Sequence, residues 1–111
     1  MTDSLRMLLT GCASGIGRHL TGALSARGHR VVATDLDIEA LEAESKRRSW
    51  SVERVKLRAL DVRSEGDWEA AMDLAFSAFG GVDVLLNIAG YLHPAYVQDF
   101  TAKDLDLHID V

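Results

Sequence analysis

Three glycines lie close together near the start of the chain, at positions 11, 15 and 17. An apolar run precedes this loop and a helical pattern follows it, which is the context of a dinucleotide pyrophosphate site. Gly11 would permit a tight turn, Gly15 a close approach of backbone to phosphate, and Gly17 close packing of helix on strand. Free N–H groups and the helix dipole favour an anion there, and the Ser14 hydroxyl could add a donor. The alternative is a glycine turn that holds no ligand.

An acidic residue ends the next apolar run. Asp35 follows Gly11 by 24 residues, close to the spacing of about 20 at which an acid binds the adenosine ribose hydroxyls. A carboxylate there would repel a 2′-phosphate, so the pattern favours NAD, with NADP less favoured. Arg18 and Arg30 are expected near enough to moderate that discrimination. The alternative is that Asp35 or Asp37 caps the following helix.

The elements that must position these residues alternate along the chain. Apolar runs predict strands over 5–10, 30–35, 52–60 and 82–87. The third run is the least apolar, which indicates a place near a sheet edge. Helical spacing follows each run, from Ile16 until Gly28, from Asp37 to Arg48, from a cap at Ser64 to residue 79, and again from residue 101 after a loop over 91–100.

The apolar spacing of the helices predicts which side chains face inward. The first helix repeats apolar residues at 16, 20, 23 and 24, and the second turns Ile38 and Leu41 inward. A charge-rich face over 39–48 is expected to be solvated. The third helix supplies an inward stripe at intervals of three and four residues, made of Trp68, Ala71, Met72, Ala75, Phe76 and Phe79.

Near-continuous apolar strands that alternate with helices indicate parallel pairing with helices on both faces. Right-handed crossovers then give one mononucleotide-binding half of a doubly wound, Rossmann-type α/β fold. No repeat or linker interrupts the pattern, so residues 1–111 are expected to form a single NAD-binding domain.

Composition narrows the class of protein. The 111 residues are 48% apolar and 26% charged, a balance typical of a soluble globular domain. A net charge of −5 argues against a nucleic-acid partner. No apolar run approaches the roughly 20 residues that span a bilayer, and residues 1–6 lack the apolar segment of a secretory signal, so we expect neither feature. The single cysteine fits a reducing cytoplasm, so we expect a cytoplasmic protein with no membrane partner.

Four stretches, in order, resemble the short-chain dehydrogenase/reductase family. The glycine loop and Asp35 match the family's cofactor motif and its NAD-selecting acid. Residues 61–62 resemble its adenine-contacting pair, and residues 87–90 its Asn-Asn-Ala-Gly motif, with Ile88 in place of the second Asn. The cofactor-binding residues that the resemblance implies are Gly11, Ser14, Gly15, Ile16, Gly17, Asp35, Leu36, Asp61, Val62, Asn87, Ala89 and Gly90.

The resemblance implies hydride transfer between an alcohol or ketone and NAD. Family catalysis uses a Tyr-x-x-x-Lys pair, which neither Tyr91 nor Tyr96 begins. Residues 105–111 resemble the segment that leads to the family's helix asparagine. We therefore expect the cofactor half of an oxidoreductase, truncated before its second half and inactive alone, with no catalytic or metal residue to name. The family sheet has strand order 3-2-1-4 and continues with a fifth strand. Without that fifth strand, strand 82–86 would form an exposed sheet edge, so we expect either self-association or a longer chain. The complete protein is expected to be a homo-oligomer.

Other interpretations remain open at the level of sequence. The chain could be a non-catalytic dinucleotide-binding or interaction module, or an S-adenosylmethionine methyltransferase, which also pairs a glycine loop with an acid. Cys12 could be a redox switch near a helix N-terminus, although an unremarkable loop position is favoured. The histidines show no ligand spacing and are expected at the surface, with substrate contact as the alternative for His93.

Overall fold

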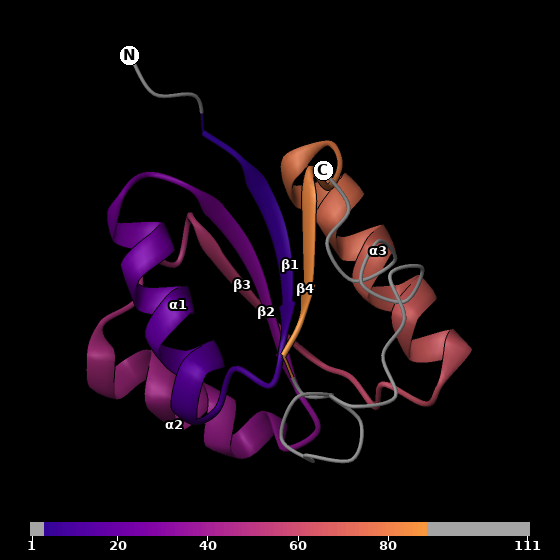
Figure 1. Cartoon of the computed structure of the whole chain (residues 1–111), viewed down its shortest axis with the longest axis horizontal. Coiled ribbons are helices and arrows are strands. Elements are labelled where there is room, and N and C mark those ends of the chain that lie inside the picture. Colours follow the sequence, from indigo (N-terminus) through magenta and orange to yellow (C-terminus); the bar gives the residue numbers. More distant parts are fainter. Residues whose placement is uncertain (1–3, 89–111) are drawn as a thin grey trace, which may run out of the picture.

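The computed structural model describes residues 4–88, which form a parallel four-stranded sheet with helices on both faces (Figure 1). The strand order is β3-β2-β1-β4. This confirms the predicted Rossmann-type α/β fold and its order 3-2-1-4. In chain order the elements are β1 (Arg6–Thr10), α1 (Gly15–Ala26), β2 (Arg30–Asp35), α2 (Ile38–Arg48), β3 (Val55–Ala59), α3 (Glu65–Phe79) and β4 (Val84–Asn87).

Alternation along the strands divides the apolar side chains between two cores. Leu8 and Val32 are adjacent in the parallel register of β1 and β2 and pack with α3 residues such as Ala75. Their neighbours Met7 and Leu9 belong to the opposite core, under α1 and α2. Because successive strand side chains point to opposite faces, a strand that is apolar throughout fills both cores. Figure 1 shows α1 and α2 on one side of the sheet and α3 on the other.

The third strand lies at a sheet edge, as predicted, but it is shorter than the expected 52–60. It covers Val55–Ala59, because a turn precedes it in which the Val55 N–H donates to the Ser51 carbonyl at 2.8 Å. The Arg54 N–H donates to the Ser51 hydroxyl at 3.2 Å. The residues just before β3 therefore use part of their hydrogen bonding within this turn, although the Arg54 carbonyl still accepts from the Val31 N–H of β2 at 2.7 Å.

Two helices begin at the side-chain caps that their sequences indicate. Asp37 accepts from the Ala40 N–H at the start of α2, and Ser64 accepts from the Asp67 N–H at the start of α3. The capping role thus belongs to Asp37 and not to Asp35, which answers one of the alternatives left open by the sequence.

Two side chains differ from the helical-spacing prediction. Phe76 is 58% exposed and lies outside the core of α3, and Ile16 is 66% exposed. On α1 the small residues Gly17, Thr21 and Ser25 are buried in place of Ile16. Small side chains let α1 approach the sheet closely, which turns its first apolar residue toward solvent. Trp68 and Met72 pack partly buried against their core, whereas Ala71, Ala75 and Phe79 are fully part of it.

The charged face of α2 also differs from its prediction, because Glu44 is buried rather than solvated. Its carboxylate accepts from the Arg48 Nε at 2.9 Å and lies within ion-pair distance of Arg18 and Arg47. The hydrogen bond from Arg48 is the main cause that holds the pKa of Glu44 below its usual value. Glu44 therefore fastens α1 to α2.

The predicted loop over 91–100, the helix from residue 101, His93, and the site residues Ala89 and Gly90 lie outside the described part of the chain. Within residues 4–88, no helix is long and apolar enough to cross a membrane.

Candidate functional site

The strongest candidate site lies at the carboxyl edge of the sheet, where β1 and β2 end. A pocket of about 260 Å³ is open there. It is lined by residues that follow β1, β2 and β3: Gly11, Asp35, Leu36, Leu60, Asp61, Val62 and Arg63. Five of these are residues that the sequence predicted as a cofactor site, and the fold brings them together from three separate segments.

The N-terminus of α1 differs from those of the other two described helices. Its N-cap, Ser14, makes no side-chain capping bond, and its first turn carries no acidic residue. The first turns of α2 and α3 each carry a side-chain cap and an acid. An uncapped helix N-terminus presents N–H donors and the positive end of its dipole. Ser14, Gly15 and Ile16 are all exposed, so an anion can reach this end of α1.

At two positions of the loop, the backbone geometry disfavours any side chain. Gly15 has φ +59°, in the left-handed region that side chains disfavour. A Cβ on Gly17 would lie 2.1 Å from the Gly11 carbonyl oxygen. The sequence assigned Gly17 to close packing of the helix, and this contact confirms that role. The first turn of α1 is therefore pressed directly against the loop that leaves β1.

Asp35 links the loop to the end of β2. One carboxylate oxygen accepts from the Ala13 N–H and the other from the Asp37 N–H, each at 3.0 Å. A carboxylate has about four acceptor positions, so each oxygen can accept another hydrogen bond. The side chain is half-buried and lines the pocket. Asp35 is therefore oriented by the backbone and still able to bind a diol.

Asp61 lies across the same pocket and is paired with Arg63. Arg63 donates from Nε and from its terminal nitrogen to the two Asp61 oxygens at 3.1 and 3.0 Å. These bonds are the main cause that lowers the pKa of Asp61, so the group is a carboxylate at neutral pH. Sequence reasoning missed Arg63 as a pocket residue. Its signal was a basic residue two positions beyond the expected adenine-contacting acid.

Apolar side chains complete the pocket. Leu36 is 70% exposed, which is unusual for a leucine that could be buried, and Val62 is half-buried. Both line the pocket with Leu60. An exposed apolar wall beside two carboxylates matches a ligand that has a flat apolar part and hydrogen-bond donors.

Asn87 ends β4 beside the end of β1. Its Oδ1 accepts from the Thr10 hydroxyl at 2.7 Å, and both side chains are buried. This bond fastens the strand that carries the glycine loop to its neighbour. Ile88, which stands where the family motif has a second Asn, is also buried and belongs to the core with Met7 and Leu9.

One of the two arginines expected near the cofactor lies far from the pocket, and the other lies in the first turn of α1. Arg30 begins β2, at the end of the sheet opposite the pocket, where its guanidinium lies over the Phe79 ring at 5.9 Å from the centroid. The prediction that Arg30 moderates phosphate discrimination is therefore wrong, because the residue starts the strand that Asp35 ends. Arg18 is held by Glu44 at 3.5 Å.

Cys12 is a core residue, with no exposed surface. Burial is the main cause that raises the pKa of its thiol to about 11, so the alternative in which the helix N-terminus favours the thiolate does not hold. Its Sγ lies 3.5 Å from the Leu9 carbonyl oxygen. The redox-switch interpretation fails for lack of both thiolate and access. No three-residue cluster of metal-binding side chains occurs among residues 4–88.

Known proteins resemble this chain in sequence and in fold. A family model described as enoyl-(acyl carrier protein) reductase matches residues 11–111. The chain belongs to the short-chain dehydrogenase/reductase family. It is 33% identical over 104 residues to D-threitol dehydrogenase of Mycolicibacterium smegmatis, covering 94% of this chain and 40% of that protein. It is 41% identical over 103 residues to 2-(R)-hydroxypropyl-CoM dehydrogenase of Xanthobacter autotrophicus, covering 84% and 41%.

Solved structures of short-chain dehydrogenases/reductases agree with the fold. A glucose/ribitol dehydrogenase from Brucella melitensis superposes with a TM-score of 0.68 at 38% identity, covering 75% of this chain and 35% of that one. A 3-ketoacyl-(acyl-carrier-protein) reductase from the same organism, complexed with NADH, has a TM-score of 0.64 at 31% identity, covering 72% and 32%. The chain thus spans about 40% of the length of the curated relatives it matches. Family membership removes the methyltransferase alternative, since the family is one of oxidoreductases.

Proposed function

We propose that the chain is the cofactor-binding part of an NAD-dependent short-chain oxidoreductase, which transfers hydride between an alcohol or ketone and NAD. The single observation that carries this proposal is the pocket that joins Gly11, Asp35 and Asp61. A dinucleotide needs an anion site, a diol acceptor and a base wall in that arrangement, at the carboxyl ends of parallel strands. Bound NAD would supply the hydride acceptor.

The pyrophosphate would bind at the N-terminus of α1. The absence of a side-chain cap and of acids in its first turn leaves the helix dipole uncompensated there by neighbouring side chains. The exposed Ser14 hydroxyl could donate to a phosphate oxygen, and the left-handed Gly15 lets the backbone approach without a Cβ in the way.

The adenosine end would bind in the pocket. Asp35, held by the Ala13 and Asp37 N–H groups, would accept from both ribose hydroxyls. A 2′-phosphate would bring two negative charges against that carboxylate, which favours NAD over NADP. The adenine ring would lie between Leu36 and Val62, with the Asp61 carboxylate accepting from its amino group. Asn87, Ala89 and Gly90 would contact the nicotinamide half by family resemblance.

The sharpest test exchanges Asp35 for serine and measures NAD and NADP binding by calorimetry. Loss of charge-assisted hydrogen bonds should weaken NAD binding by about 1–3 kcal/mol and narrow the difference between the two cofactors. Asp37→Ser is the matched control, because it removes the same charge two residues away and serine preserves the cap of α2. It should leave NAD affinity within about 0.5 kcal/mol.

Equal losses in the two variants would mean that Asp35 acts only through general electrostatics. An unchanged preference in Asp35→Ser would mean that it serves the fold alone, through Ala13. Either outcome overturns the proposed ribose contact.

A non-catalytic dinucleotide-binding module is the second candidate. It is favoured by one observation: neither Tyr91 nor Tyr96 has a lysine four residues on. Turnover of any alcohol by this chain with NAD would eliminate it, and binding of NAD without turnover would support it. For the complete protein we propose an alcohol or ketone substrate, a homo-oligomeric state and a cytoplasmic location. We propose neither nucleic acid nor a membrane as a partner.

A further inference from the structure

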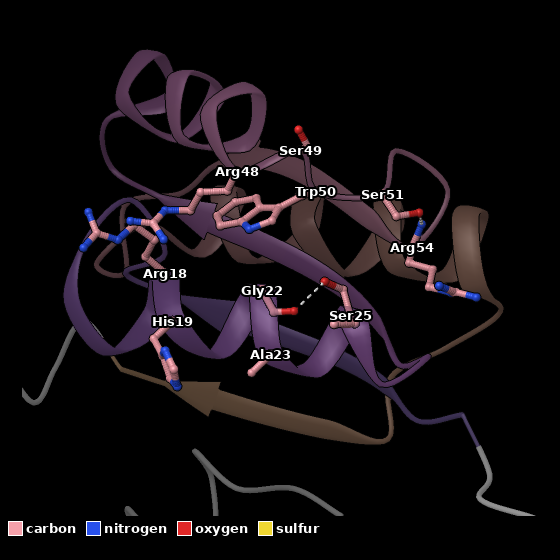
Figure 2. A pocket seen from close by; sticks show the side chains of 11 residues that line it. Arg18, His19, Gly22, Ala23, Ser25, Arg48, Ser49, Trp50, Ser51 and Arg54 are labelled. Carbon is pink, nitrogen blue, oxygen red and sulfur yellow. Dashed lines mark hydrogen bonds between the residues drawn. The ribbon is translucent and has the colours of Figure 1, made fainter.

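A second cavity, larger than the pocket at the carboxyl edge of the sheet, lies beside α1. It has a volume of about 460 Å³ and runs between α1 and the connection from α2 to β3 (Figure 2). None of its lining residues lines the nucleotide pocket. The lining residues that matter for its chemistry are Arg18, Gly22, Arg48, Trp50 and Arg54.

The buried wall of this cavity carries an unused donor. Trp50 is 7% exposed, and its indole N–H has no hydrogen-bond acceptor among residues 4–88. The other tryptophan, Trp68, donates to the Val62 carbonyl at 2.8 Å, as buried indoles generally do. The Trp50 Nε1 would lie 3.3 Å from a Cβ on Gly22. It therefore faces α1 at Gly22, where an added methyl group would require a shift of a few tenths of an ångström.

The charge around this donor is positive. One carboxylate, Glu44, is shared by the guanidinium groups of Arg18, Arg47 and Arg48. The Arg54 side chain forms no ion pair with any described residue. Figure 2 shows Arg18 and Arg48 at one end of the cavity and Arg54 at the other, with Trp50 between them. This excess contrasts with the net charge of −5 of the chain.

We propose that this cavity is a second ligand site, which binds the phosphate or carboxylate group of a small organic anion. The anion accepts from the Trp50 indole N–H and lies between the arginines at the two ends. Guanidinium groups and a ring N–H are all donors, and a charged acceptor strengthens each hydrogen bond. The face of Ala23 and the edge of the indole give the ligand's carbon skeleton an apolar wall.

The test uses the two indole N–H signals in a ¹H–¹⁵N correlation spectrum of the full chain. Inorganic phosphate and acetate are titrated separately, each at an ionic strength fixed with NaCl so that screening stays constant. The Trp50 signal should shift saturably, while the Trp68 signal, already hydrogen-bonded, stays in place. Saturation by phosphate alone would assign a phosphate ester, and saturation by acetate alone a carboxylate. A Trp50 shift that remains linear throughout both titrations overturns the proposal.

Two variants and a control separate this site from other anion contacts. Arg54→Gln should weaken binding about tenfold, as expected for one charge-assisted contact. Gly22→Ala should weaken binding and reduce the Trp50 shift at a given anion concentration, because its methyl group would lie 3.3 Å from Nε1 and occupy part of the space beside it. Arg58→Gln, an exposed arginine on β3 outside the cavity, should leave the titration unchanged.

Equal weakening by Arg54→Gln and Arg58→Gln would show only general attraction and would overturn the site. The outcome is independent of the proposed NAD function, since Asp35→Ser leaves every group in this cavity intact. Anion binding at the N-terminus of α1 would move the amide signals of residues 15–17 and not the Trp50 indole.

Discussion

The contact between Gly17 and the loop makes a quantitative prediction for Gly17→Ala. The added Cβ would lie 2.1 Å from the Gly11 oxygen, 2.7 Å from its carbonyl carbon and 3.0 Å from the Cys12 Cα. Ordinary contact begins at 3.4 Å, so α1 must retreat by about 1.3 Å. All three obstructing atoms are backbone and cannot yield by rotating a side chain. Overpacking of this kind costs about 1–3 kcal/mol of unfolding free energy.

Urea unfolding followed by circular dichroism measures that cost, and Gly66→Ala supplies the matched control. Gly66 lies in the first turn of α3, where the nearest atom to an added Cβ is the Ser64 Oγ at 3.8 Å. The same substitution in open space should stabilise the chain by about 0.5–1 kcal/mol, through helix propensity. Gly17→Ala should therefore lower the urea concentration at the unfolding midpoint, and Gly66→Ala should raise it.

Gly17→Ala should also weaken NAD binding by about tenfold or more, since moving α1 costs at least one charge-assisted hydrogen bond to phosphate. Gly66→Ala should not change the affinity. If Gly17→Ala folds with unchanged stability and binds NAD normally, then the helix does not depend on this close approach. The reasoning that joins the glycine loop to the cofactor would be refuted.

Two further predictions concern ionisable groups. Arg6 donates to both oxygens of Asp83 and lowers the pKa of that carboxyl group. A carboxyl group whose pKa is lowered by folding stabilises the fold when the pH is above its pKa in the unfolded chain, about 3.9. That stabilisation is lost as the pH falls below this value. Asp83→Asn should therefore lower the urea midpoint at neutral pH, with a difference that shrinks in acid; a constant difference would contradict the ion pair. The Cys12 thiol has a pKa of about 11 and should resist alkylation by iodoacetamide at neutral pH until urea unfolds the chain. Mass spectrometry measures the extent of alkylation. Rapid alkylation of the native chain would contradict the burial of this side chain.

The sequence by itself determined the order of the elements and the position of the glycine loop between the first strand and the first helix. Four apolar runs separated by helical patterns are local information, and the short, β-branched run before Asp35 is typical of a buried strand. The spacing from Gly11 to Asp35 also followed from the sequence, because it reflects the length of one strand–helix–strand unit. The cap at Ser64 was available from residue type and position, whereas the sequence left the cap of α2 open between Asp35 and Asp37.

Only the tertiary structure decided which side chains are buried and which form ion pairs. Ile16 and Phe76 satisfied the helical spacing yet are exposed, because spacing gives a face and not the distance at which that face meets the sheet. Glu44 was one of many charges on α2 until Arg18 of another helix was brought against it.

The same holds for the site. Parallel strands bring Asp35 and Asp61 to one edge, although 26 positions separate them in the sequence. Arg30 was near Asp35 in sequence and lies at the far end of the same strand. Local pattern determines the conformation of each segment, whereas neighbours in space determine burial, ion pairing and pocket shape, because those energies depend on contacts between residues far apart along the chain.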